Sequence, residues 1–328
     1  IDLKKDEGRA LFYKLVAESD VFLSNFQVDI LKAWGLTFEK LSEINPRLVY
    51  ATNTGYGHAT EVSRPSYDIN VQALTGIMTR QGEPGQPPIY LGMGSGDTYG
   101  GMMSALGIVL ALYQRRKTGK GQAIDASLYG AQLFMAAPTL QPFLASGNDL
   151  YQDQQARSSA RNPLWNRYRA KDKWLFLCVE NNDANWSTLA RILSSELADD
   201  PRFTTTAVRS ENAAALVAEL DLALAKQNAD AWLEEFAKEG LTAGPIQTLK
   251  EMAADPQAWE NDYLLKIACD EVGREVEIRG LPVSLHKTPG RVDTLGPELG
   301  QDTEIILMET LGLEWDQIAE LKEKGAIP

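Results

Sequence analysis

Residues 37–51 read TFEKLSEINPRLVYA, and this stretch decides the fold class. The pattern predicts a helix from Phe38 to Ile44, because Thr37 is a favoured cap before it and Asn45-Pro46 ends it. The apolar run from Leu48 to Ala51 follows at once and is typical of a buried strand. A helix joined to a strand by a short connection is the repeating unit of an α/β fold.

The same alternation continues on both sides of this stretch. The elements predicted for this half of the chain are helices over residues 6–18, 69–79 and 98–117, strands over 21–23 and 123–127, and a long helix ending near residue 144. Because strands alternate with helices, we predict an α/β domain with a mainly parallel sheet.

The second half of the chain has a different pattern. Residues 148–163 are polar and rich in Gln, Ser and Arg, which is typical of a linker or a loop. The elements predicted beyond it are a strand over 174–179, helices near 185–194, 211–226 and 229–239, a helix from about 250, strands over 264–269 and 275–279, and helices over 303–311 and 315–324. This pattern predicts a smaller second domain.

The composition is that of an ordered, soluble protein. Of 328 residues, 44% are hydrophobic and 23% are charged. The net charge of -13 repels polyanions, so we expect no nucleic-acid partner. No apolar run reaches the length of a membrane span and no secretory leader is visible, so we expect a cytoplasmic protein without a membrane partner. Ile1 leads directly into a helix without an initiator Met, and we expect a fragment.

Cysteines and histidines are too few for several kinds of site. Cys178 and Cys269 lie far apart in separate apolar runs, and the two histidines are His58 and His286. These residues predict neither a disulfide framework nor a zinc site nor a histidine-rich catalytic metal site. We therefore expect no metal and no permanently bound cofactor.

The densest cluster of glycines is in residues 92–101, which read GMGSGDTYGG. Glycines at this density indicate close approach of the backbone to another group. The stretch is not a dinucleotide fingerprint, because Tyr99 stands where a third glycine would follow Gly94 and Gly96. No Walker sequence occurs in the chain either, so simple nucleotide-binding folds lose support.

Asp97 lies within this stretch, at the predicted start of a helix, and two interpretations are open. Its carboxylate could cap the helix by accepting backbone hydrogen bonds. It could instead attack an activated acyl group as a covalent nucleophile, through a mixed anhydride. We predict the second role, because the surrounding glycines leave room for a ligand and offer N–H groups to an oxyanion. These glycines are Gly94, Gly96, Gly100 and Gly101.

A series of short segments carries a family resemblance. They are Asp20–Phe26 (DVFLSNF), Asn45–Tyr50 (NPRLVY), Arg64–Asp68 (RPSYD), Gln72–Gly76 (QALTG), Gly96-Asp97, Arg116–Gln122 (RKTGKGQ), Asp255–Gln257 (DPQ), Gly280–Val283 (GLPV) and Thr288-Pro289. Their order resembles that of the class III CoA-transferases, which include formyl-CoA transferase, carnitine CoA-transferase and α-methylacyl-CoA racemase. The resemblance covers essentially the whole chain.

This resemblance implies an activity. The family's matching aspartate is the acyl acceptor, so Asp97 is expected to be the catalytic residue of an enzyme that moves CoA from an acyl-CoA to a carboxylic acid. Acyl-CoA and the acid are then the substrates. The resemblance also implies contacts to CoA from Asn25, Phe26, Lys32 and Arg64.

The resemblance implies a fold and an assembly as well. The expected fold has a large, CoA-binding domain with an open Rossmann-like sheet over residues 1–164 and a smaller α+β domain over 165–250. Residues 251–328 are expected to return to the large domain. Family members form interlocked dimers, so we expect a homodimer of interlocked chains.

Three departures from the family pattern bear on substrate handling. The family's N-terminal βαβ unit would precede Ile1. Gln27-Val28 stands where Arg-Pro usually follows Asn-Phe, which puts a phosphate or adenine contact there in doubt. The glycine-rich loop that some members fold over the active aspartate is not recognisable, and Arg161–Asn166 occupies that region.

Two other functions remain as alternatives. The racemase branch uses a histidine and an aspartate as paired acid and base. Where that branch resembles GHDIN, this chain has Ser66–Asn70 (SYDIN), so the histidine is missing. A non-catalytic CoA-binding partner subunit is the second alternative, and the presence of Asp97 argues against it.

Overall fold

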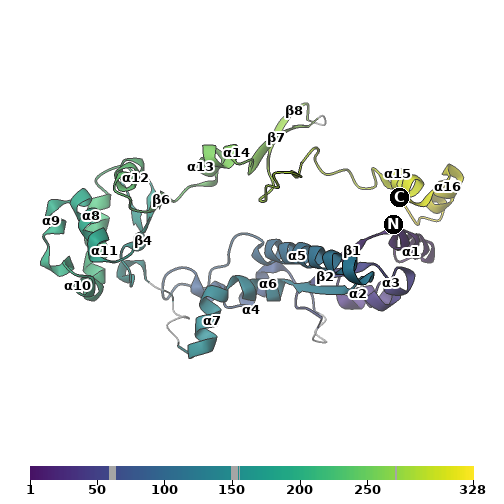
Figure 1. Ribbon diagram of the computed structural model, residues 1–328, viewed down its shortest axis with the longest axis horizontal. Helices are drawn as coiled ribbons and strands as arrows, with labels where there is room; N and C mark the ends of the chain where they lie inside the picture. The colour runs from purple at the N-terminus through teal and green to yellow at the C-terminus, as the bar shows by residue number, and fades with distance from the viewer. Residues whose placement is uncertain (59–63, 149–153, 155, 270–271) are drawn as a thin grey trace. The chain divides into compact units, whose positions relative to one another are not determined.

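The computed structural model describes residues 1–58, 64–148, 154, 156–269 and 272–328. It divides into two compact units. Figure 1 shows the chain coloured by residue number. The first unit contains Ile1–Gln154 and Pro297–Pro328, and the second contains Gln155–Gly296. Of the linker predicted over 148–163, residues 149–153 and 155 lie outside the described residues.

The sheet of the first unit is parallel. Its strands are β1 (Val21–Ser24), β2 (Val49–Thr54) and β3 (Ala123–Ser127), in that spatial order. Ala51 in the central strand pairs with Leu23 on one side and Ile124 on the other. The prediction of an α/β fold with a parallel sheet is therefore confirmed.

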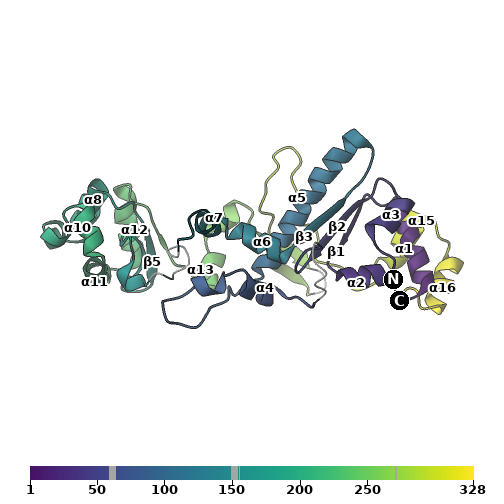
Figure 2. The ribbon, with the colours of Figure 1, turned by 90° about the horizontal axis from the view of Figure 1, so that it is seen from below.

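Helices cover both faces of this sheet. On one face Tyr50 packs in a buried cluster with Val16, Leu31, Leu36, Leu41 and Leu48, and its hydroxyl donates to the Leu36 carbonyl at 2.8 Å. On the other face α5 (Ser95–Thr118) packs across β2 and β3 (Figure 2). Because side chains alternate along a strand, Asn53 points to the α5 face while Tyr50 points away from it.

The helices at the start of the chain have their predicted bounds. They are α1 (Asp6–Glu18) and α3 (Phe38–Ile44), and the Thr37 hydroxyl accepts a hydrogen bond from the Lys40 N–H at 3.4 Å. Three later predictions were wrong in extent. α4 (Asp68–Leu74) is shorter than expected and is followed by η1 (Met78–Arg80). α5 begins at Ser95 rather than after Asp97.

The long helix expected to end near residue 144 is divided in two. Its parts are α6 (Leu128–Met135) and α7 (Ala137–Ser146). Pro138 stands in the first turn of α7, where its missing N–H and its ring disfavour a continuous helix.

The C-terminal helices pack against the first helix. The remaining helices of this unit are α2 (Val28–Ala33), α15 (Thr303–Leu311) and α16 (Trp315–Glu323). Leu11 of α1 forms a buried cluster with Leu307, Ile318 and Ile327. The Asp2 N–H also donates to the Ala326 carbonyl at 2.8 Å. The last residues of the chain are thereby part of the first unit.

The second unit combines helices with antiparallel strands. Its main sheet has the order β4 (Trp165–Arg169), β5 (Trp174–Cys178), β6 (Ala243–Pro245). Its helices are η3 (Arg157–Ser159), α8 (Asp183–Leu193), α9 (Ser195–Ala198), η4 (Pro201–Phe203), α10 (Thr206–Glu211), α11 (Ala213–Leu224), α12 (Ala229–Lys238), α13 (Leu249–Ala253) and α14 (Pro256–Glu260). A separate hairpin pairs β7 (Leu264–Cys269) with β8 (Arg274–Arg279). The core contains Tyr168, Leu177, Trp186 and Phe236.

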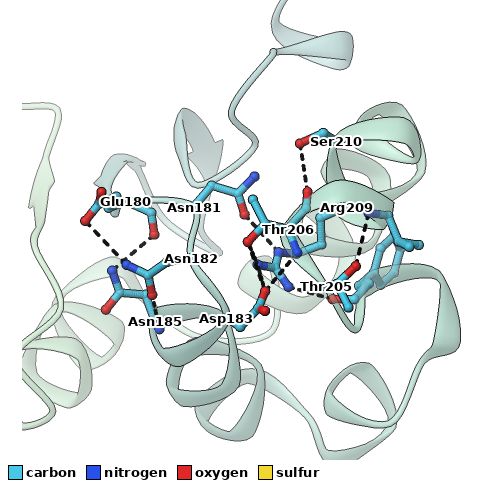
Figure 3. Close-up of polar contacts among 11 residues, drawn as sticks. Glu180, Asn181, Asn182, Asp183, Asn185, Thr205, Thr206, Arg209 and Ser210 are labelled. Atoms are coloured by element: carbon cyan, nitrogen blue, oxygen red, sulfur yellow. Dashed lines mark hydrogen bonds and ion pairs between the residues drawn. The ribbon is translucent and has the colours of Figure 1, made fainter.

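Arg209 is a buried cation that joins several segments of this unit (Figure 3). Its guanidinium donates to Asn181 Oδ1 at 2.8 Å, to Asp183 Oδ1 at 2.7 Å and to the Phe203 carbonyl at 2.9 Å. The Arg209 side chain has 0% of its surface exposed, whereas Asp183 is 61% exposed. The charge is therefore compensated by hydrogen bonds to groups fixed by α8, η4 and the loop before α8.

We expect Arg209→Met to destabilise the second unit by about 2–3 kcal/mol, because it leaves buried acceptors without a donor. Native-state hydrogen exchange at the amides of α8 and α11 measures this loss. Arg191→Met is the matched control, since Arg191 pairs with Glu239 at the surface and should cost less than about 1 kcal/mol. Equal effects of the two substitutions would contradict the prediction.

Candidate active site

Asp97 is the third residue of α5, and it is not the cap of that helix. The residue in the cap position is Gly94. Asp97 is exposed, and no donor in the described part of the chain reaches its carboxylate. The structural interpretation of Asp97 as a helix cap is therefore wrong in this structure. Its carboxylate is available to a ligand.

Asp68 supplies the acceptor that the start of α5 needs. Its Oδ2 accepts hydrogen bonds from the N–H groups of Gly96, at 2.5 Å, and of Asp97, at 3.0 Å. The side chain of Gln72 donates to the other oxygen of Asp68, and its Oε1 accepts from the Leu91 N–H at 3.0 Å. Two residues of α4 thus hold both the preceding loop and the first turn of α5.

The same carboxylate affects the ionisation of Asp97. Partial burial and the negative charge of Asp68 raise the pKa of Asp97 above its ordinary value. A more basic carboxylate is a stronger nucleophile while it is ionised, and it is more easily protonated in acid. The environment of Asp97 therefore makes its carboxylate more basic than that of an ordinary aspartate.

The four predicted glycines have different surroundings. A methyl group at Gly96 would lie 3.2 Å from Cδ of Gln132, and one at Gly100 would lie 3.1 Å from the amide atoms of Asn53. A methyl group at Gly94 would lie 3.3 Å from the Asp97 carboxylate, and Gly101 faces open space. A Cβ at position 96 would therefore clash with the Gln132 amide, and one at position 100 would be in tight contact with Asn53.

One expectation about these glycines needs correction. The Gly96 N–H is not free to hold an oxyanion, because it already donates to Asp68. Gly100 and Gly101 lie inside α5, one turn beyond Asp97. A direct contact of any of these glycines with substrate stays a prediction.

The residues predicted to contact CoA lie in different places. Asn25 and Phe26 line a cavity of about 450 Å³, together with Leu23, Ser24, Asn53 and Ser104. Lys32 lines a separate cavity of about 230 Å³ that His58 and Asp125 also line. The Arg64 guanidinium lies over the ring of Tyr56, 4.2 Å from its centre. Their binding of CoA stays a prediction.

Other candidate groups are engaged or buried. His58 Nε2 lies 3.1 Å from the Thr52 hydroxyl, and the backbone N–H of His58 donates to the Asp125 carboxylate at 2.8 Å. Cys178 and Cys269 are free thiols. In the described residues, no group of three His, Cys, Asp or Glu side chains could hold a metal ion. No helix in that part of the chain is long and apolar enough to cross a membrane.

Sequence reasoning missed two residues of this site. Asp68 was noted only as part of a motif, because its partners, the Gly96 and Asp97 N–H groups, are 28 and 29 residues away in the sequence. Asn53 is a polar residue within the strand VYATNT, and a polar side chain inside such a strand points to a specific partner.

Comparison with known proteins decides the family. The sequence profile described as CoA-transferase family III matches residues 1–303. The chain belongs to this family. The resemblance inferred from the short segments is confirmed, and with it the membership of an enzyme family. The parallel sheet with helices on its faces agrees with the fold of a solved CAIB/BAIF family protein.

Several similar proteins are named as CoA-transferases. Acetyl-CoA:oxalate CoA-transferase of Acetobacter aceti is 36% identical over 308 residues, which cover 91% of this chain and 77% of that protein. Succinyl-CoA–D-citramalate CoA-transferase of Chloroflexus aurantiacus is 31% identical over 332 residues, covering 100% of this chain and 81% of that protein. The crystal structure of a CAIB/BAIF family protein from Brucella suis is 33% identical, with a TM-score of 0.82, and covers 94% of this chain and 80% of that one.

Proposed function

We propose that this protein transfers coenzyme A from an acyl-CoA to a carboxylic acid through a covalent intermediate on Asp97. The observation that carries the proposal is the exposed Asp97 carboxylate, which accepts no hydrogen bond from the described residues and whose pKa is raised by partial burial and by Asp68. A cavity lined by Asn25, Phe26 and Ser104 of α5 has the volume of a small-molecule site. Family membership supports the substrate class.

The proposed reaction proceeds by alternating attacks at carbonyl carbon. An oxygen of Asp97 attacks the thioester carbonyl, the C–S bond breaks, and CoA leaves as a thiolate. The thiolate then attacks the Asp97 carbonyl of the mixed anhydride, which releases the donor acid and leaves an aspartyl-CoA thioester. The acceptor carboxylate attacks this thioester and frees CoA thiolate again. Attack of the thiolate on the new acyl carbonyl gives the new acyl-CoA and restores Asp97.

Three further features belong to the proposal. The acceptor is a small dicarboxylic acid, since the similar transferases carry oxalate and D-citramalate in their names. The active protein is an interlocked homodimer. The functional domains are residues 1–164 for CoA, 165–250 as the small domain, and 251–328 as the returning segment.

Exchange of CoA between acids tests this function directly. We expect the protein, incubated with acetyl-CoA or succinyl-CoA and a panel including oxalate and D-citramalate, to form the CoA thioester of an added acid. Mass spectrometry detects each new thioester without a coupled assay. A protein that binds acyl-CoA but forms none of these thioesters, while releasing no free CoA, would contradict the proposal.

The racemase alternative is tested with the same protein. A chiral 2-methylacyl-CoA in deuterated water should keep its α-proton, because the histidine of the two-base mechanism is replaced within Ser66–Asn70 and the ring Nε2 of His58 lies 3.1 Å from the Thr52 hydroxyl. NMR follows the α-proton signal. Catalytic deuterium incorporation without CoA exchange would favour the racemase.

A further inference from the structure

Buried polar atoms without partners gather around the first turns of α5. In the described residues, three buried side-chain atoms lack a hydrogen-bond partner: Asn53 Oδ1, Ser95 Oγ and Gln132 Nε2. Ser95 begins α5, Gln132 lies against Gly96, and Asn53 lies against Gly100. An unpaired buried polar atom costs free energy, so such atoms are usually explained by a ligand or a functional role. Their clustering marks a polar binding region beside Asp97.

Asn53 is the member of this cluster that faces a cavity. It lines the cavity of about 450 Å³ with Asn25, Phe26 and Ser104. Neither end of its amide forms a hydrogen bond within the described residues. One end is buried against Gly100, and the side chain as a whole is only half-buried. Because Oδ1 is buried, Nδ2 is the end of the amide that can donate a hydrogen bond to whatever occupies the cavity.

The cavity lies on the side of α5 that carries the nucleophile. Residues three and seven positions apart share one face of a helix, so Asp97, Gly100 and Ser104 form a single stripe. Gly100, which contacts Asn53, is about 4.5 Å along the helix axis from Asp97. The cavity also opens where β1 and β2 end, which is where ligands bind in parallel sheets.

These positions indicate which part of a bound acyl-CoA lies near each residue. The reacting carbon must sit at Asp97, and Asn25 and Phe26, which line the cavity with Asn53, are the predicted contacts of the CoA nucleotide. Asn53 also lies against Gly100, one helical turn from Asp97. The part of CoA between its thioester and its nucleotide is the pantetheine arm, which carries secondary amides. The Nδ2 group of Asn53 can donate a hydrogen bond to the carbonyl oxygen of such an amide.

We propose that Asn53 binds the pantetheine arm of CoA through a hydrogen bond between its side-chain amide and an amide of the arm. This inference rests on the proposed function, because it takes Asp97 as the position of the thioester. Asn53 then sets the distance between the held arm and the carboxylate. It is a positioning residue that contacts the part of the substrate common to all acyl-CoA thioesters.

The test measures binding without turnover. Asn53→Leu, of similar shape but without polar atoms, and Asn53→Ser are compared with the unmodified protein by calorimetry, with CoA and with 4′-phosphopantetheine as probes. We expect the Kd of both probes to rise by the same factor, about 5- to 30-fold in the leucine variant, as one buried hydrogen bond is lost. The KM of the acceptor acid should not change.

Several outcomes would overturn this inference. They are an unchanged Kd for CoA in both variants, a rise confined to CoA and absent with 4′-phosphopantetheine, and a fall in kcat with both Kd values unchanged. The second would place Asn53 at the nucleotide, and the third would place it at the thioester carbonyl. A protein that binds CoA with the expected dependence on Asn53 but exchanges none would contradict the proposed function alone.

Discussion

Asp97→Asn is expected to lower the rate of CoA exchange by more than about 10³-fold, because an amide cannot form the anhydride that the reaction requires. The fold should be unaffected. No donor in the described part of the chain binds the Asp97 carboxylate, and the start of α5 is held by Asp68. Removing one of two nearby negative charges also relieves repulsion between Asp97 and Asp68.

Asp316→Asn is the matched control for this substitution. Asp316 is likewise an exposed aspartate in the first turn of a helix, α16. Its replacement should change neither the exchange rate nor the melting temperature by a measurable amount. A loss of activity in both variants would mean that removing a negative charge at the start of a helix, and not removing the nucleophile, lowers the activity.

The covalent intermediate provides an independent readout. Hydroxylamine added during turnover should convert the Asp97 anhydride or thioester to a hydroxamate on the tryptic peptide of residues 81–115. Mass spectrometry of that peptide locates the modification. Near-normal exchange by Asp97→Asn, with no adduct on this peptide in the unmodified protein, would show that another group carries the acyl chain.

Local sequence signals were sufficient to predict much of the secondary structure of the first unit. The helices Asp6–Glu18 and Phe38–Ile44 and the strand Ala123–Ser127 have the predicted bounds, because caps, prolines and apolar runs next to them determine where they end. The start of α5 was misplaced for the opposite reason. Its first N–H groups are satisfied by Asp68, which is 29 residues before Asp97, and no local pattern shows this partner.

Two strands of the second unit were missed because tertiary contacts determine them. In β4 the two buried residues are Asn166 and Tyr168, so the strand lacks the apolar alternation by which strands are recognised. Asn166 is accommodated by donating to the Arg157 carbonyl at 2.9 Å. β6 is only Ala243–Pro245, and it forms by pairing with Leu175–Leu177 of β5.

The candidate site was predictable only at its centre. Asp97 stands out because glycines surround it in sequence. The contributions of Asp68 and Asn53 depend on which elements the topology brings to α5, and a single sequence does not contain that information. Conversely, Lys32 was grouped with Asn25 by sequence, whereas the two side chains line different cavities.

After Asp97, Asp68 is the residue whose replacement should affect catalysis most. Asp68→Ala removes the acceptor for the Gly96 and Asp97 N–H groups, so the first turn of α5 loses its anchor. We expect kcat/KM at its optimal pH to fall by about 10²-fold, the cost of a small misplacement of a reacting group. A fall of less than about twofold would mean that other contacts hold the nucleophile.

Asp68→Asn separates the charge of Asp68 from its positioning role. Its single carbonyl oxygen can still accept from the Gly96 and Asp97 N–H groups, and only the hydrogen bond from the Gln72 side chain is lost, so the maximal rate should stay closer to that of the unmodified protein than in Asp68→Ala. Only ionised Asp97 attacks, and Asp68 raises the pKa of Asp97, so losing this charge lowers that pKa. The acid limb of the kcat/KM profile should therefore move to lower pH in Asp68→Asn. An unmoved limb, measured with the same acyl-CoA, would show that the two carboxylates do not interact in the working enzyme.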